Sequence, residues 1–255
     1  MQKAIIGGTG VYDIGRATSR VITTEYGITE VDVINIKGVE IAFLSRHGKG
    51  HSVPPHMINY RANMKALKKL GVKYIYSTCA VGSLNENFAP GDVVVLKDFI
   101  DFTKGRPLTF YEGGSRGVAH VAMDAPYCPY LREKFIVHAN KTNLKIKGDA
   151  VYVCTEGPRF ETASEIKMFK TLGGDVVGMT NVPEVVLAKE LGMCYQAVGI
   201  ITNWCTGIKG EVMEHDIKVI MEENKALITN TFISVLTQED LVQDACNCED
   251  SLLIL

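Results

Sequence analysis

The sequence predicts a single α/β domain over residues 1–255, in which helices pack against a mixed β-sheet. Three observations support this prediction. Short runs rich in β-branched residues recur along the whole chain, and several lack polar/apolar alternation, as in strands buried on both faces. Helical stretches separate these runs. No linker divides the chain, and its 255 residues are ample for one large core.

Eight strands are predicted, and the second and third form a hairpin. Lys37-Gly38 joins them as a tight turn, so the sheet contains an antiparallel pair and is mixed. The predicted strands span 4–8, 31–36, 39–44, 74–81, 92–99, 150–155, 175–179 and 197–202. The predicted helices span 56–70, 127–140, 161–172, 182–191 and 214–236. Gly71, Gly173 and Gly192 stand where helices end on a glycine.

The composition excludes several classes of protein. Hydrophobic residues make up 46% and charged residues 22%, which is typical of soluble globular proteins and excludes disordered, collagen-like and coiled-coil chains. The formal net charge of -2 argues against a dedicated nucleic-acid binder but allows a small anionic substrate. No segment is apolar enough to span a membrane, and the N-terminus does not resemble a signal peptide. We therefore predict no nucleic-acid and no membrane partner.

The seven cysteines predict a reducing compartment. Their number is odd and their spacing matches no disulfide framework, which is typical of reduced thiols in a cytoplasmic enzyme. Cys246 and Cys248 lie close together in the sequence, and a disulfide or a weak metal site remains an alternative to the plain thiols that we expect there.

Glycine- and threonine-marked strand ends predict a ligand site. Gly7-Gly8-Thr9-Gly10 follows the first strand and suits an anion, although a plain tight turn explains it equally. Ser45-Arg46-His47-Gly48 follows the third strand and forms either an anion clamp or a solvated surface pair. His47, His51 and His56 are separated by glycines and prolines, so we expect no metal there. Ligands bind outside the carboxyl ends of strands in open α/β sheets.

Further strand ends carry candidate residues. Cys79 ends a strand, and we expect a buried structural thiol rather than a nucleophile. Glu161 follows the rigid turn Gly157-Pro158-Arg159 and either faces the site or merely favours a helix N-terminus. Met179-Thr180 and Asn203-Trp204 close two more apolar strands.

Together these motifs resemble the family of trimeric purine nucleoside phosphorylases and 5′-methylthioadenosine phosphorylases. The resemblance implies a partly closed sheet and a homotrimer with sites at its interfaces, and the sequence leaves a hexamer open as the alternative assembly. It also implies reversible phosphorolysis, with inorganic phosphate as co-substrate and no cofactor or metal. The matching segments are IIGGTG, RHG, PPHMINYRANMKAL, STCAVGS, PGDVVVLKDFIDFT, EGPRFET and GMTNVPEVVLAKELG.

The resemblance also assigns roles to residues. Asn203, Glu161 and His47 would be the catalytic residues. Met179 would lie under the pentose, Glu214 or His215 at its 5′ end, and the region around His120 would close a neighbouring subunit's site. The residues that would hold phosphate are Thr9, Arg46, His47, Cys79, Ala80 and Thr180, with Cys79 acting through its backbone. Those that would face the base are Glu161, Asn203, Trp204 and Cys205.

Asn203 and Glu161 predict a 6-oxopurine base. The carboxamide can donate to O6 and reach N7, and the carboxylate can accept from N1–H, which adenine lacks. Family members that cleave adenosines resemble ITDYD at the last strand end, where this chain reads ITNW. We predict phosphorolysis of inosine or guanosine. A phosphorylase of S-methyl-5′-thioinosine or methylthioadenosine is the alternative, because a small alignment shift brings Met213 to the 5′ end. A non-catalytic nucleotide-binding protein is a more distant one.

Overall fold

The computed structural model describes residues 1–7, 17–209 and 214–255, and only the backbone of 214–221 within the last range. The strands are β1 (Lys3–Gly7), β2 (Thr18–Thr24), β3 (Gly27–Ile36), β4 (Val39–Ser45), β5 (Tyr74–Ser83), β6 (Val93–Phe102), β7 (Ala119–Val121), β8 (Ile146–Thr155), β9 (Val176–Gly178), β10 (Cys194–Trp204) and β11 (Leu252–Ile254). The α-helices are α1 (Tyr60–Lys69), α2 (Pro129–Lys141), α3 (Ala163–Thr171), α4 (Asn181–Glu190) and α5 (Glu214–Gln238). All the predicted strands and helices are present, with shifted ends.

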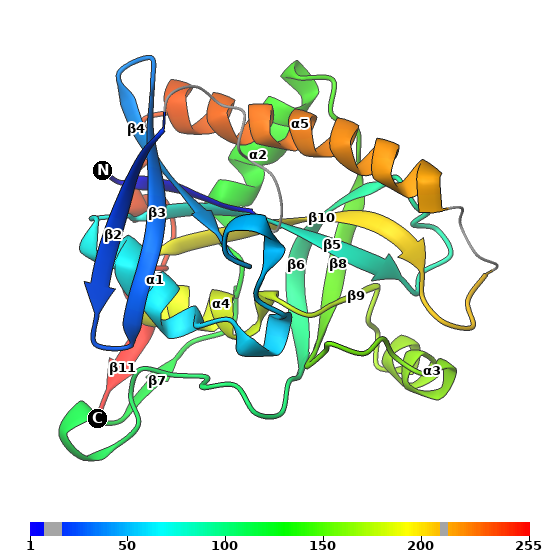
Figure 1. Cartoon of the computed structure of the whole chain (residues 1–255), viewed down its shortest axis with the longest axis horizontal. Helices are drawn as coiled ribbons and strands as arrows, with labels where there is room; N and C mark the ends of the chain where they lie inside the picture. The colour runs from blue at the N-terminus through cyan, green and yellow to red at the C-terminus, as the bar shows by residue number, and fades with distance from the viewer. Residues whose placement is uncertain (8–16, 210–213) are drawn as a thin grey trace.

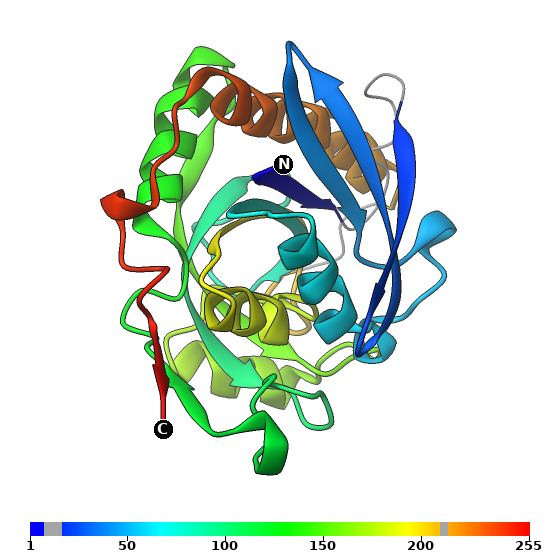
Figure 2. The same ribbon diagram turned by 90° about the vertical axis from the view of Figure 1, so that its left-hand side faces the viewer.

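Part of the large sheet closes on itself. Its strand order is β10-β6-β8-β9-β5-β1-β4-β3-β2, and β10 also pairs with β5, so that β5, β10, β6, β8 and β9 form a ring. The β10–β6 and β5–β9 pairs are antiparallel, whereas β5–β10, β6–β8 and β8–β9 are parallel. The expectation of a mixed, partly closed sheet is confirmed, and the ring is visible in Figure 2.

The predicted hairpin is present at the other end of the sheet. β3 and β4 are antiparallel, and the φ angles of 53° at Lys37 and 85° at Gly38 match the left-handed turn that suits a two-residue hairpin loop. β2 was not predicted from the sequence. It pairs only with β3 among the described strands, and Val21 in it is 68% exposed, so its residues follow no buried pattern.

Helices cover both faces of the sheet, and the alternation of side chains along β1 shows how. Ala4 and Ile6 lie in a core that includes Met64 of α1 and Val185 of α4. Ile5 between them lies in a second core, together with residues of α2 and α5. Successive strand residues face opposite sides, so one short strand joins two helical layers. Figure 1 shows α5 along one side of the sheet and α1 and α4 on the other.

Local signals in the sequence set several helix ends. Thr162 caps α3 by accepting from the backbone N–H of Glu165, whose carboxylate accepts in return from the Thr162 N–H. Gly71, Gly173 and Gly192 follow α1, α3 and α4 with φ angles of 81°, 88° and 65°, as predicted. α1 begins later than predicted, because Pro55–Met57 forms a separate 3₁₀ turn. Within the described residues no helix is long and apolar enough to cross a membrane.

Candidate active site

A cavity of about 520 Å³ lies at the ends of β5, β9 and β10. Most of the residues predicted to bind phosphate or nucleoside line it. They are Arg46, His47, Cys79, Ala80, Glu161, Met179, Thr180, Asn203 and Cys205. His51, Phe160 and Lys225 also contribute to its wall, and Phe160 is 76% exposed. The fold therefore brings residues from six separate segments to one cavity.

An interruption in strand pairing opens the wall of this cavity. On one edge of β5, the ladder with β1 ends at Ser77, and the ladder with β9 begins at Gly82. Among the residues that the structure describes, no strand pairs on that edge with the residues between them, and Ala80 is exposed although its neighbours Cys79 and Val81 are buried. A stretch of backbone free of a strand partner can present its N–H groups to an anion. This is the stretch to which the sequence assigned phosphate binding.

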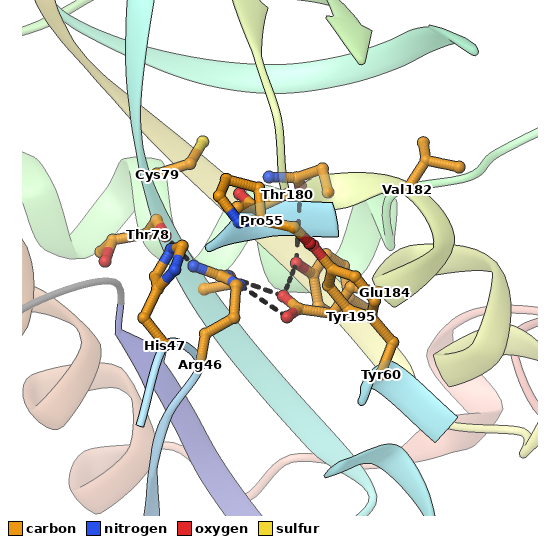
Figure 3. Close-up of polar contacts among 12 residues, drawn as sticks. Arg46, His47, Pro55, Tyr60, Thr78, Cys79, Thr180, Val182, Glu184 and Tyr195 are labelled. Atoms are coloured by element: carbon orange, nitrogen blue, oxygen red, sulfur yellow. Dashed lines mark hydrogen bonds and ion pairs between the residues drawn. The ribbon is translucent and has the colours of Figure 1, made fainter. Parts of the chain in front are cut away.

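Arg46 is buried at one end of the cavity and is held from several sides (Figure 3). Its Nε donates to Glu184 Oε2 at 2.6 Å, and one terminal nitrogen donates to Glu184 Oε1 at 2.7 Å. Further N–H groups donate to Ser77 Oγ and to the Thr78 carbonyl. Within the described part of the chain, four of the five guanidinium N–H groups are thus engaged, and one has no protein partner there and can serve a ligand.

Glu184 compensates the charge of this arginine. It lies in the first turn of α4, its side chain is fully buried, and it also accepts from the Tyr195 hydroxyl at 2.6 Å. A buried cation requires such a partner, since an unpaired charge in a protein interior is strongly unfavourable. The pair is neutral as a whole, and it fixes the guanidinium beside β5.

His47 is buried next to Arg46 and is oriented by the backbone. Its Nδ1 lies 2.8 Å from the Val53 carbonyl, so Nδ1 carries a proton and Nε2 remains for a ligand. The His51 ring stacks on it at 4.2 Å. Burial lowers the pKa of His47 to about 4, and the nearby Arg46 charge adds to this. The imidazole is therefore neutral at pH 7.

Glu161 and Asn203 lie at the other end and are held by close neighbours in the sequence. Thr155 donates its hydroxyl to Glu161 Oε1 at 2.6 Å, which leaves Oε2 available. Thr202 donates to Asn203 Oδ1 at 2.7 Å, and Asn203 Nδ2 donates to the Trp204 carbonyl at 2.9 Å, which leaves one amide hydrogen. The residue that caps α3 is Thr162, so Glu161 is not a helix cap.

The structure does not place Trp204 in the described wall of the cavity. Asn203 and Cys205 line the cavity, but Trp204 between them is not among its lining residues. The Lys209 ammonium lies 4.6 Å from its ring centre. Burial, together with the Glu161 charge, raises the pKa of Cys205 to about 12, and burial raises that of Cys79 to about 12, so neither thiol is an activated nucleophile.

With this geometry established, comparisons with known proteins decide the family. The sequence model of the phosphorylase superfamily matches residues 2–236. The chain belongs to this superfamily. The prediction of a nucleoside phosphorylase from the motifs is thereby confirmed.

Relatives with assigned names include several phosphorylases. The chain is 50% identical to a probable 6-oxopurine nucleoside phosphorylase of Moorella thermoacetica, over 88% of each chain. It is 46% identical to the 6-oxopurine nucleoside phosphorylase of Pyrococcus furiosus, over 98% of this chain and 97% of that one. It is 45% identical to a probable S-methyl-5′-thioinosine phosphorylase of Methanothermobacter thermautotrophicus, over 97% and 88% of the two chains.

Solved structures agree with this assignment. A methylthioadenosine phosphorylase from an Antarctic soil metagenomic library superimposes with a TM-score of 0.91 at 33% identity, over 100% of this chain and 92% of that one. The methylthioadenosine phosphorylase of Schistosoma mansoni in complex with tubercidin gives a TM-score of 0.84 at 34% identity, over 94% and 93% of the two chains.

Some predicted residues of this phosphorylase lie outside the described part of the chain. Thr9 falls in residues 8–16, and the side chains of Glu214 and His215 fall in 214–221. His120 lies on β7, exposed and outside the described cavity wall. These assignments stay predictions.

Sequence reasoning missed two buried residues that support the phosphorylase site, Glu184 and Arg106, and one that lines it, Lys225. Glu184 resembles an ordinary acidic residue in the first turn of a helix, and only its burial shows its role. Arg106 is buried and donates to the Val182 and Glu156 carbonyls at 2.6 and 2.7 Å, joining the end of β8 to the start of α4. Lys225 of α5 carries no motif signal that could have placed it at the cavity.

Proposed function

We propose that residues 1–255 form one phosphorylase domain that catalyses the reversible phosphorolysis of 6-oxopurine nucleosides. Inosine or guanosine reacts with inorganic phosphate to give the free purine and ribose 1-phosphate. One observation carries the proposal: Glu161 and Asn203, the residues suited to a 6-oxopurine, line the same cavity as Arg46, His47 and Thr180. The names of the relatives from Moorella thermoacetica and Pyrococcus furiosus support it.

Phosphate would bind at the Arg46 end. The remaining N–H of Arg46, the backbone along Ala80 and the Thr180 hydroxyl are the donors available there. Neutral His47 presents the Nε2 lone pair, which accepts a hydrogen bond from the P–O–H group of monohydrogen phosphate. Held in this way, a phosphate oxygen lies in position to attack the anomeric carbon as the glycosidic bond breaks. Thr9 would add a further hydroxyl.

The base would bind at the Glu161 end. Glu161 Oε2 accepts from purine N1–H, and the remaining amide hydrogen of Asn203 reaches O6 or N7. Negative charge develops on the leaving purine in the transition state, and a donor placed at that position lowers the barrier. Met179 and Cys205 also line the cavity, and they would contact the pentose and the base respectively. Neither half of this mechanism draws on a cofactor, and we propose that none is needed.

The 5′ end of the sugar distinguishes the proposed function from its alternative. S-Methyl-5′-thioinosine carries the same base, and relatives such as that of Methanothermobacter thermautotrophicus bear that name. A polar Glu214 or His215 at the 5′ position favours a hydroxyl. We therefore propose ribonucleosides as substrates.

We further propose a cytoplasmic homo-oligomer, a trimer or a hexamer, in which the region around His120 closes a neighbouring site. The odd number of cysteines and their irregular spacing in the sequence support a reducing compartment. Sedimentation should give a multiple of the 28.0 kDa chain. An active monomer would contradict this assembly.

A substrate panel with phosphate tests the function. Inosine, guanosine, adenosine, methylthioadenosine and methylthioinosine are compared by kcat/KM. We expect inosine and guanosine to exceed adenosine by at least a hundredfold, because adenine leaves Glu161 and Asn203 mispaired. A wild-type preference for adenosine would show that the base site is wrongly assigned. No phosphate-dependent release of base from any substrate would favour a binding protein.

The Glu161→Ser/Asn203→Asp double variant tests the residues behind that preference. Each mispaired buried group costs about 1–3 kcal/mol, so the inosine-to-adenosine ratio should fall by two or more powers of ten. Equal losses for both nucleosides would instead indicate a purely structural role. Glu86→Gln, which changes an exposed carboxylate outside the cavity wall, is the matched control.

A further inference from the structure

Four cysteines outside the active site converge on one point, although they come from three distant parts of the chain. Cys128 is the residue that precedes α2, Cys194 begins β10, and Cys246 and Cys248 lie in the C-terminal segment before β11. Their Sγ atoms all lie within 4.8 Å of one another. Three of the side chains are buried and Cys246 is half-buried. None of the four lines the active-site cavity.

The spacing of the sulfur atoms indicates what the cluster can hold. Tetrahedral Zn²⁺ with Zn–S bonds of about 2.3 Å places its sulfur ligands roughly 3.8 Å apart. A disulfide requires about 2.05 Å. Cys194 Sγ and Cys246 Sγ are 3.4 Å apart, and all four cysteines are free thiols. The arrangement fits four separate ligands around one ion rather than two bonded pairs.

The backbone holds the cluster in place. The Cys128 N–H donates to the Tyr195 carbonyl at 2.8 Å, directly linking the start of α2 to β10. The Cys194 N–H donates to the Lys73 carbonyl at 2.8 Å, and the Cys246 N–H donates to the Gln243 carbonyl at 3.0 Å. Ligand positions fixed by the fold in this way reduce the ordering that metal binding requires.

The surroundings favour thiolates. A four-thiolate zinc centre carries two negative charges, and the N-terminus of α2 presents partial positive charge at Cys128. The Lys189 ammonium is nearly buried and donates to the carbonyl of Ala125, three residues before Cys128. A cation therefore lies close to the cluster.

We propose that Cys128, Cys194, Cys246 and Cys248 form a structural site for one tetrahedral Zn²⁺ ion. Four sulfur ligands leave no open coordination position for substrate. The ion therefore cross-links distant segments of the chain and takes no part in phosphorolysis. It joins the C-terminal segment to the start of α2 and to β10. β11 follows in that segment and pairs with β7, which carries His120 (Figure 2). The site departs from the plain thiols expected for Cys246 and Cys248.

Metal analysis of the full chain tests the proposal. The protein is purified under reducing conditions without chelator, and its zinc content is measured by mass spectrometry. We expect about one zinc ion per chain. Removal should lower the melting temperature by roughly 10 °C, because the ion binds the folded chain alone.

Variants and a second metal keep the test decisive. Cys246→Ser/Cys248→Ser should lose the zinc, whereas Cys154→Ser, which removes a buried thiol outside the cluster, should retain it. If the double variant fails to fold, Co²⁺ added to the reduced, metal-free wild type should give the strong visible absorption of tetrahedral cobalt–thiolate coordination. Chains without zinc whose four thiols are free or joined in disulfides would overturn the proposal. Stoichiometric iron would overturn its assignment to zinc.

Discussion

The two ends of the active-site cavity are built in opposite ways. At the phosphate end, Arg46 is held by residues 31, 32 and 138 positions away in the sequence, and all of these contacts are buried. At the base end, Glu161 is held by a residue six positions away, and Asn203 by its two immediate neighbours. One end depends on the tertiary fold, and the other on local segments at strand ends.

Because of this difference, we expect changes at the phosphate end to affect the stability of the fold and changes at the base end to affect substrate specificity. A buried ion pair shared between distant elements is strongly destabilising to break, so the phosphate end cannot change without risk to the fold. Short local contacts on half-buried residues can change with little loss of stability, so the base end can adapt to another base. The contrast fits a family whose members act on phosphate in common and differ in nucleoside.

The largest expected effect follows from removing the charge that compensates Arg46. Glu184→Gln leaves a buried guanidinium without its anion, and we expect the free energy of unfolding to fall by about 3–5 kcal/mol. Denaturant unfolding with a constant m-value measures this. Glu86→Gln removes the carboxylate partner of exposed Lys170, and it should leave the unfolding midpoint nearly unchanged. Similar losses in both variants would contradict the proposed contrast.

A smaller effect should appear in the pH dependence of stability at His47. Its folded-state pKa of about 4 lies below the unfolded value of 6.5, so the unfolded chain binds more protons between these values. The stability that His47 contributes is therefore present above pH 6.5 and is lost as the pH falls towards 4. The expected loss is about 2–3 kcal/mol.

The His47→Asn variant isolates this contribution. It should lose less stability than wild type on acidification between pH 6.5 and 4, while the difference between the two proteins stays constant above pH 7. Unfolding free energies measured at several pH values provide the check. Parallel curves across the whole range would show that His47 is not held neutral by burial.

The sequence predicts features that depend on neighbouring residues better than it predicts contacts between residues far apart in the chain. Strands such as 74–81 were identifiable because they are apolar without alternation, and Glu161 and Asn203 because they follow strands directly. Glu184 could not be identified, since an acid in the first turn of a helix normally favours the helix dipole. Cys128 and Cys194 could not be linked to Cys246, because sequence spacing does not reveal which thiols meet in space. β7 and β11 could not be predicted, because each has only three residues and so short a strand shows no periodic pattern.

The smallest expected effect concerns the local contact at the base end. Thr202→Val removes the hydroxyl that donates to Asn203 Oδ1 but keeps the shape of the side chain. The Trp204 carbonyl still holds Nδ2, so the amide loses one of its two fixed contacts. We expect kcat/KM for inosine to fall roughly three- to tenfold, which corresponds to about 1 kcal/mol for one neutral hydrogen bond. The KM for phosphate and the unfolding midpoint should hardly move, because Arg46 and His47 lie at the other end of the cavity. Steady-state kinetics with inosine and phosphate varied in turn measure both values. If the KM for phosphate rose by the same factor as kcat/KM for inosine fell, the two ends of the cavity would be coupled rather than independent.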